Sequence, residues 1–163
     1  MSQPGALAGE HVRILFRLEK GADDYPPAEV ERLWARSLED GSFEIDNIPF
    51  FVRDISVGDV VSARSQEGEW EFSELLRASG NSTLRVIVFD PARVASTREY
   101  LQAQGCSSEL HTSKLLSVDV PAQADLWAIR DWLSRQEAAG LLEFEDACLR
   151  HAERLNAAYE KRD

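Results

Sequence analysis

Several features that would point to a specific chemistry are missing from this sequence. The two cysteines, Cys106 and Cys148, belong to no Cys-x-x-Cys pair, and the three histidines show no His-x-x-x-His or His-Glu-x-x-His spacing. A zinc site is therefore not expected, and in a reducing compartment the two thiols should stay unpaired. No glycine-rich loop carries the lysine of a phosphate-binding P-loop. We accordingly predict no catalytic residue set, no metal and no cofactor.

Long apolar runs are also missing. No stretch approaches the ~20 residues of a membrane span, and the N-terminus lacks the basic and apolar regions of a secretion signal. The sequence thus predicts a cytoplasmic protein with no membrane contact. Its 163 residues and hydrophobic content of 44% suit one domain, or two small subdomains that share a core.

Positive charge is scarce. The formal net charge is −11, of which residues 1–80 carry −8 and residues 81–163 carry −3. Such a chain repels phosphate backbones, so no nucleic-acid partner is expected. A basic protein surface would be attracted to it, and we predict such a partner for a monomer or weak dimer. The alternative is that the charge serves solubility alone.

The first half of the chain shows short strand patterns separated by turns. Apolar residues alternate with polar ones from His11 to Glu19, which predicts a half-buried strand. Pro26 and Pro27, followed by apolar residues at helical spacing, predict a helix that ends at Asp40-Gly41 and holds Trp34 in the core. Further strands are expected at Phe43–Ile45, at Phe50–Val52 and from Trp70, and a turn over Ile55–Val61 is expected to feed a strand that runs to about Arg64.

The second half shows the order strand, helix, strand, strand, helix, strand. Asp90-Pro91 predicts a helix start, Gly105 its end, and a second helix is expected from about Asp125 to Ala138. Strands are expected at Thr83–Phe89, near Glu109–Thr112, at Leu116–Val120 and at Leu142–Phe144.

These patterns define an α+β fold class. We expect a loose leader over residues 1–10 and, over residues 11–80, a small curled antiparallel sheet or partial barrel with one helix. Residues 81–150 are expected to form a ferredoxin-like βαββαβ unit. A terminal helix is expected from about Ala147, with residues 151–163 as a helical tail.

The densest acidic patch surrounds an aromatic residue. Glu67, Glu69 and Glu71 fall on one side of a predicted hairpin that contains Trp70, and Glu44 and Asp46 share one face of a strand. An acidic rim around an aromatic anchor suits recognition of a basic protein. The alternative interpretation is an ordinary charged hairpin with Trp70 turned into the core.

A second hypothesis places an enzyme site or a small-ligand-sensing site in a cleft between the two halves. Asp46, Asn47, Ser79, Arg85 and His111 are its candidate lining residues. His111 lies among polar neighbours and equally fits an exposed surface histidine.

Five short motifs together resemble a known family. They are Glu31-Arg32-Leu33-Trp34, Asn47-Ile48-Pro49-Phe50-Phe51, Gly58-Asp59-Val60-Val61, Ser79-Gly80 with Ser82-Thr83-Leu84-Arg85-Val86, and Gly105-Cys106. Over roughly residues 12–150 the chain resembles the bacterial family catalogued as domain of unknown function 4265. Asn81 stands where we expect a histidine in relatives, which removes one candidate catalytic group. Small acidic bacterial proteins of this sort resemble immunity proteins, so the resemblance suggests neutralisation of a cognate toxin by direct binding.

Overall fold

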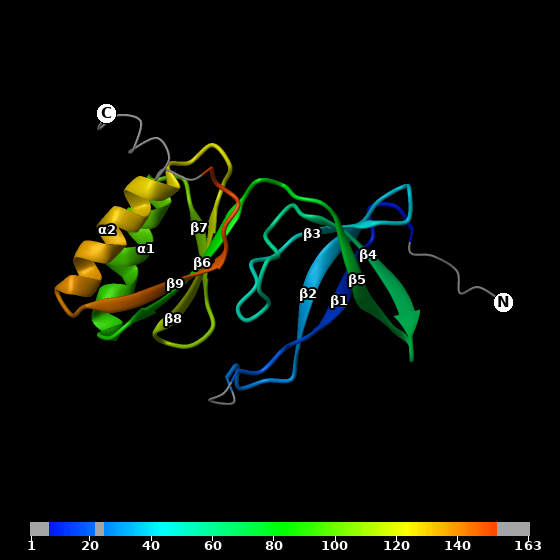
Figure 1. The fold of residues 1–163 in the computed structure, drawn as a ribbon, viewed down its shortest axis with the longest axis horizontal. Coiled ribbons are helices and arrows are strands. Elements are labelled where there is room, and N and C mark those ends of the chain that lie inside the picture. Colours follow the sequence, from blue (N-terminus) through cyan, green and yellow to red (C-terminus); the bar gives the residue numbers. More distant parts are fainter. Residues whose placement is uncertain (1–6, 22–24, 153–163) are drawn as a thin grey trace.

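The computed structural model describes residues 7–21 and 25–152, which form two lobes joined side by side (Figure 1). The N-terminal lobe is a barrel of five strands: β1 (His11–Arg17), β2 (Val30–Ser37), β3 (Phe43–Ile45), β4 (Val60–Gln66) and β5 (Glu69–Arg77). The C-terminal lobe has a sheet of β6 (Ser82–Val88), β7 (Ser107–Leu110), β8 (Leu115–Val120) and β9 (Leu142–Cys148), with helices α1 (Val94–Ala103) and α2 (Leu126–Ala138). The predicted α+β class is confirmed.

The barrel is a meander in which each strand pairs antiparallel with the next. It closes because β1 also pairs with β5, in parallel, through Ile14–Trp70 and Leu15–Glu71. The predicted curled sheet is therefore a closed barrel. Its core is formed by inward-facing apolar side chains, among them Ile14, Phe16, Leu33, Phe43, Ile45 and Val61.

The helix predicted between Pro27 and Leu38 is wrong, because this segment is strand β2. Leu33, Ala35 and Ser37 point inward and are buried, whereas Arg32, Trp34 and Arg36 point outward and are exposed. The same residues fit a helical spacing, but the two-residue alternation prevails since β1 pairs along the whole strand. Trp34, predicted in the core, is 47% exposed on the barrel exterior.

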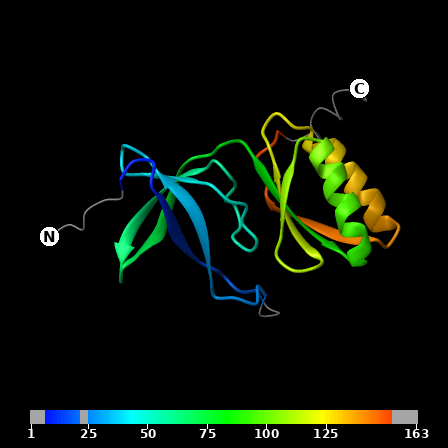
Figure 2. The ribbon, with the colours of Figure 1, turned by 180° about the vertical axis from the view of Figure 1, so that it is seen from behind.

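The strand predicted at Phe50–Val52 is also wrong. Residues 46–59 contain no strand and form a long loop between β3 and β4. This loop lies between the lobes in both ribbon views (Figures 1 and 2). The turn expected from Ile55 belongs to the same loop, and the strand that it was expected to feed is β4, which begins at Val60.

The C-terminal lobe has the predicted order of strands and helices. Its strand order is β7-β8-β6-β9, with every neighbouring pair antiparallel. Both helices cover the face turned away from the barrel (Figures 1 and 2). The Asp90 carboxylate accepts a hydrogen bond from the amide of Ala92 at 3.0 Å, in a 3₁₀ turn (Pro91–Arg93) that leads into α1. Asp125 caps α2 in the same way through the amide of Ala128.

The C-terminal end of the described chain differs from the prediction. Ala147 and Cys148 are the last residues of β9, so the predicted terminal helix does not begin there. The remainder of that predicted tail, residues 153–163, lies outside the described residues, as do leader residues 1–6. Gly9 and Glu10 exchange backbone hydrogen bonds with Ser37 of β2.

Within residues 7–21 and 25–152, no helix is long and apolar enough to cross a membrane.

Both cysteines are buried and unpaired. Burial, with a smaller contribution from the charge of Asp119, raises the pKa of Cys106 to about 12. The Cys106 thiol therefore stays protonated near neutral pH and is a poor nucleophile.

Candidate functional site

The acidic residues predicted to bind a partner lie on the barrel exterior, and most are matched by a basic side chain. Glu69 accepts hydrogen bonds from Arg32 at 2.7 and 3.2 Å, and Glu44 pairs with Arg36. Asp46 lies 3.0 Å from the His11 imidazole. The Arg32 guanidinium lowers the pKa of Glu69. The sequence shows the acids, but the β2–β3 pairing sets Arg36 opposite Glu44, and barrel closure brings Arg32 of β2 to Glu69 of β5.

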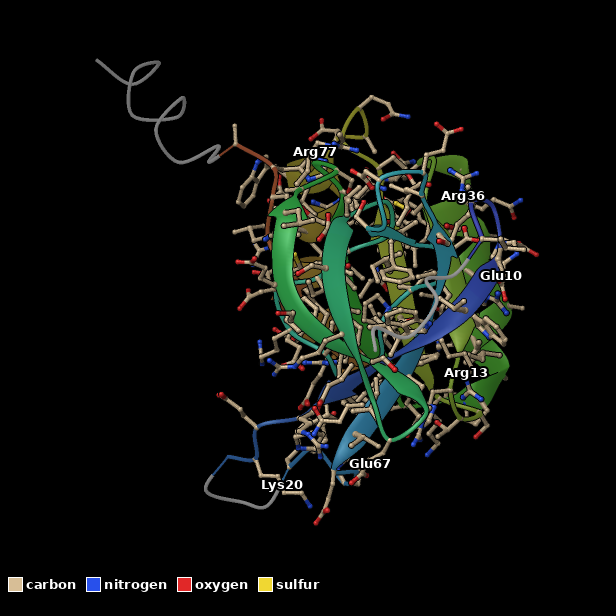
Figure 3. The ribbon with its side chains drawn as sticks, turned by 90° about the vertical axis from the view of Figure 1, so that its right-hand side faces the viewer. Glu10, Arg13, Lys20, Arg36, Glu67 and Arg77 are labelled. Carbon is tan, nitrogen blue, oxygen red and sulfur yellow. The ribbon has the colours of Figure 1, made fainter. Side chains whose placement is uncertain are left out.

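The other members of this predicted patch occupy three different positions. Glu71 is almost buried and accepts a 2.5 Å hydrogen bond from Arg17. Trp70 points inward and packs 5.1 Å from Phe43, ring centroid to ring centroid, as in the alternative interpretation. Glu67 is exposed at the tip of the β4–β5 hairpin, with a positive φ of 51° (Figure 3). The structure therefore does not assemble the predicted acidic rim around an aromatic anchor.

A single carboxylate organises the loop between the lobes. Glu31 of β2 accepts hydrogen bonds from three consecutive amides, those of Phe50 at 2.8 Å and of Phe51 and Val52 at 2.9 Å each. These amides would otherwise be part-buried donors without a strand partner. Because Glu31 holds this stretch in a fixed turn, the Phe50 carbonyl is directed toward the C-terminal lobe.

Three arginines tie that loop to the C-terminal lobe. Arg85 of β6 is almost fully buried and donates to the Phe50 carbonyl at 2.5 Å and to Glu145 at 2.7 Å. Arg53 makes longer contacts of 3.3 Å with Glu145 and 3.4 Å with the Asp146 carbonyl. Arg150 donates to the Asp54 carbonyl at 2.8 Å, beside a backbone hydrogen bond from Asp54 to Ala147. We refer to this set of contacts, together with Glu31, as the joint.

A buried aspartate fixes the second part of the joint. Asp59, fully buried, accepts hydrogen bonds from the amides of Ser56 and Ser79 at 2.9 and 2.8 Å. A Cβ on Gly58, which has φ +85°, would lie 2.9 Å from the Ser79 Cβ. Ser79 also donates its hydroxyl to the Val57 carbonyl. Ser79 is therefore a turn-forming residue rather than a lining residue of a cleft.

Asp119 of β8 lies in the same polar layer. Burial, reinforced by the charge of Asp59 and opposed by a hydrogen bond from Asn81, raises the pKa of Asp119 to about 6. Asn81 donates its amide to both carboxylate oxygens at 3.3 and 3.4 Å and accepts from the amide of Ala122. Asn81 thus acts as a bridge between the β5–β6 connection and the turn after β8.

Ser82 and His151 form a hydrogen-bonded pair that no sequence pattern predicted. The Ser82 hydroxyl lies 2.7 Å from His151 Nδ1, while His151 Nε2 lies 2.9 Å from the Pro121 carbonyl. The carbonyl can only accept, so Nε2 carries the hydrogen and Nδ1 accepts from Ser82. Ser82 is fully buried and also accepts from the amide of Arg150, so this pair anchors the chain after β9.

Of the residues predicted to line a cleft, the structure places one in such a position. Arg85 lines a cleft of about 850 Å³ on the barrel side of the joint. Asn47 instead accepts a hydrogen bond from the amide of Trp34, and Asp46 is on the barrel exterior. His111 is exposed and packs against the rings of Phe50 and Phe51, at centroid distances of 4.8 and 5.3 Å.

This cleft opens beside the short β1–β5 pairing that closes the barrel. Beyond Leu15–Glu71, strands β1 and β5 separate, and the cleft lies between their diverging ends. We call it the seam cleft. Its apolar lining includes Phe16 and Phe72, whose rings stack at 4.6 Å, together with exposed Leu75 and Tyr25. It is continued by the β1–β2 connection, the loop at 51–55, and Arg85, Glu145 and Arg150 of the second lobe.

The seam cleft gathers several of the chain's scarce basic residues. Five basic and three acidic side chains line it, a formal net of +2 within a protein of −11, although Arg17 and Arg150 also pair with Glu71 and Asp59 next to it. The basic residues are Arg17, Lys20, Arg53, Arg85 and Arg150; the acidic ones are Glu19, Asp54 and Glu145. The side chains of Arg17 and Arg53 are 69% and 58% exposed. Arg150 Nε is a buried donor without a partner among the described residues.

Concave shape, aromatic lining and a few convergent charged groups are the usual properties of a ligand site, and the volume lies within the common range. Of its lining residues, only Arg85 was predicted from the sequence. The lining residues are scattered from Phe16 to Arg150, and no local spacing joins them. One signal was available in the sequence: the first half contains few basic residues, so the position of each in the fold could have been considered separately.

Comparison with known proteins gives a family and a fold. A family model described as Domain of unknown function (DUF4265) matches residues 31–144. A hypothetical protein from Neisseria gonorrhoeae, known from its crystal structure, is similar with a TM-score of 0.72 at 22% sequence identity. The match covers 90% of this chain and 99% of that one, and at this identity it establishes the fold alone. No curated protein matches.

Proposed function

Because the chain belongs to the family described as Domain of unknown function (DUF4265), whose description specifies no activity, we propose a function from the geometry: this is a binding domain that holds an anionic, partly apolar ligand in the seam cleft. The single observation behind this proposal is the net positive, aromatic-lined cleft in an otherwise acidic protein. The ferredoxin-like strand order of the second lobe is compatible with ligand sensing but does not specify it.

The cleft residues supply two kinds of interaction. Arg17 and Arg53 each pair with one glutamate, but their guanidinium groups are exposed and their remaining N–H groups can donate to a carboxylate, sulfonate or phosphate; such charge-assisted hydrogen bonds are the stronger ones. Part-buried Phe72 and exposed Leu75 offer apolar area beside them. The joint fixes the loop at 51–55, so part of the site is organised before any ligand arrives.

An anionic aromatic probe tests this proposal directly. Titration with 8-anilinonaphthalene-1-sulfonate, which joins a sulfonate to aromatic rings, should give saturable fluorescence enhancement with the native protein. Arg53→Ser should weaken binding about tenfold, since it removes a charge-assisted donor. Near-ultraviolet circular dichroism must stay native, because the same dye also binds loosely packed states.

Arg36→Ser is the matched control. Arg36 is exposed on β2, pairs with Glu44 as Arg53 pairs with Glu145, lies outside the seam cleft, and is well separated from Lys20 in Figure 3. Equal affinity of the wild type and both variants, or no saturable binding, would contradict the proposal.

A second candidate function is neutralisation of a basic toxin by the acidic exterior, as an immunity protein would perform it. The net charge of −11 and the exposed Glu67 favour this candidate, while the arginine partners of Glu44 and Glu69 weaken it. Co-purification with the product of the adjacent gene, lost in a Glu67→Lys/Glu69→Lys variant, would support it. No complex and no protection from that product's toxicity would rule it out.

A further inference from the structure

The outer half of β5 has one edge without a strand partner. On one side, β4 pairs with it through Ala63–Phe72, Ser62–Glu74, Val61–Leu75 and Val60–Arg77. On the other side, β1 pairs only with Trp70 and Glu71. In the part of the chain that the structure describes, no strand pairs with the second edge of β5 from Phe72 to Arg77. We call this segment the seam edge.

The seam edge is apolar as well as unpaired. Leu75 and Leu76 are consecutive and are 38% and 52% exposed. Successive side chains of a strand point to opposite faces, so both faces are open here. An exposed apolar strand edge is a template for another strand, and proteins usually protect such edges. Here the charged residues of the edge are Glu74 and Arg77.

The seam edge borders the seam cleft, because Phe72 and Leu75 line that cleft. Across the gap lie Phe16, Arg17 and Leu18 at the end of β1. A chain placed in this gap would lie beside the unpaired edge of β5 and the cations of the cleft together. The β1–β5 ladder ends after two residue pairs, and the backbone of the added chain could form hydrogen bonds with β5 beyond that point.

Resting on the function proposed above, we propose that the ligand is an extended segment of another protein, which adds to the seam edge as an extra β-strand. Charge complementarity with Arg17 and Arg53 selects a segment that carries acidic side chains between apolar ones. Because side chains alternate along a strand, one set packs toward Phe16 and Phe72 and the other reaches solvent and the cations.

A second copy of this chain is a less suitable occupant. Each copy carries a formal charge of −11, so two copies repel one another, whereas the cleft attracts an acidic segment only locally. A small molecule could fill the cleft but would leave the amides of the seam edge without acceptors.

A displayed library of random 12-residue peptides supplies the probe. Selection on the full-length wild-type protein should enrich sequences with alternating apolar residues and at least one Asp or Glu. Synthetic versions should lose binding when every second amide is N-methylated and keep it when the intervening amides are, since only one set faces β5. If N-methylation of either set of amides leaves peptide binding equally strong, strand addition is wrong.

Amide hydrogen exchange gives the decisive readout. In the free protein, the seam-facing amides of Phe72–Arg77 should exchange quickly, and saturating peptide should slow them by at least about tenfold. Leu75→Ser should weaken the peptide about tenfold, through lost apolar contact. Leu110→Ser is the matched control, because Leu110 is 43% exposed on β7, an edge strand of the other sheet.

The outcomes separate this inference from the proposed function. Peptide binding that depends on Arg53 but leaves the Phe72–Arg77 amides unprotected would refute strand addition and keep the cleft as the site. No enriched peptide would overturn the inference, while the dye titration would still decide the proposed function. A doubled mass in light scattering, with these amides protected in the free protein, would identify a second copy as the occupant and contradict the proposal.

Discussion

The joint and the seam cleft both gather arginines, yet they use them differently. In the joint, Arg85 is nearly fully buried and bonded to the Phe50 carbonyl and to Glu145. In the seam cleft, Arg53 and Arg17 keep more than half of their side chains exposed. Buried, satisfied polar groups specify structure, whereas exposed cations beside apolar surface are available to a ligand. Substitution of the buried Arg85 should therefore change stability, and substitution of the exposed Arg17 or Arg53 should change binding.

Removing the carboxylate that organises the loop should have the largest effect. Glu31→Ala leaves three amides without their acceptor, so the free energy of unfolding should fall by about 3 kcal/mol. Urea denaturation measures it. Glu29→Ala, on the same segment but exposed, is the control and should change stability by less than about 0.5 kcal/mol. Equal effects of the two substitutions would show that Glu31 does not hold the loop.

The next largest loss of stability is expected from a substitution where two turns of the joint approach each other closely. Gly58→Ala adds a Cβ 2.9 Å from the Ser79 Cβ at a φ of +85°, so about 2 kcal/mol or more should be lost. Gly41→Ala has a similar φ of +87° with nothing within 4 Å, and should cost only the conformational part, about 1 kcal/mol. Thermal denaturation of both variants compares them. If Gly41→Ala lowers the stability as much as Gly58→Ala, the close contact between the two turns does not contribute to the loss.

Asp119 should make stability depend on pH. Its folded pKa, raised to about 6 by burial, lies above that of the unfolded chain, so the folded state favours the protonated form. The contribution of Asp119 to the free energy of unfolding is therefore greatest below about pH 4 and declines as pH rises toward 6, by on the order of 2 kcal/mol.

Asp119→Asn, which keeps the shape and the contact with Asn81, should remove this decline. Unfolding free energies from pH 4 to 7 for both proteins measure the difference, and dye affinity should not change because Asp119 is outside the seam cleft. Parallel pH profiles for wild type and variant would contradict the assignment.

The smallest effect is expected on the barrel exterior. Trp34 is 47% exposed and contacts Arg13 at 5.5 Å from its ring centroid, so Trp34→Ser should cost less than about 1 kcal/mol. Chemical denaturation gives the value, with Leu33→Ala as the buried neighbour, which should cost about 2–5 kcal/mol. If Trp34→Ser lowered the free energy of unfolding as much as Leu33→Ala, the exposed position of Trp34 would be wrong and the core position predicted from the sequence would be right.

The sequence predicted the second lobe better than the first for a physical reason. The Asp90-Pro91 start, the capping Asp125 and the alternation of Leu116, Val118 and Val120 are local signals, and the structure follows them. In β2, the same apolar positions fit either a helix or a strand, and only the long-range pairing with β1 decides between them.

The candidate site was predicted least well, again because of long-range pairing. Glu44 and Glu69 form an acidic patch in the sequence, but Arg36 and Arg32 lie beside them in the fold. The seam cleft depends on where β1 and β5 separate, which no local pattern reveals. Arg85 was singled out, yet its role in bonding the Phe50 carbonyl needs the loop that Glu31 holds.

Chemical-shift mapping of the uniformly ¹⁵N-labelled protein with 8-anilinonaphthalene-1-sulfonate tests the location of the site most directly. The account predicts that the shifted amides cluster at Phe51–Ile55, Phe72–Leu75 and Arg150, around the seam cleft. Shifts confined to the barrel exterior around Trp34 and Glu69, or the absence of any saturable shift, would contradict it.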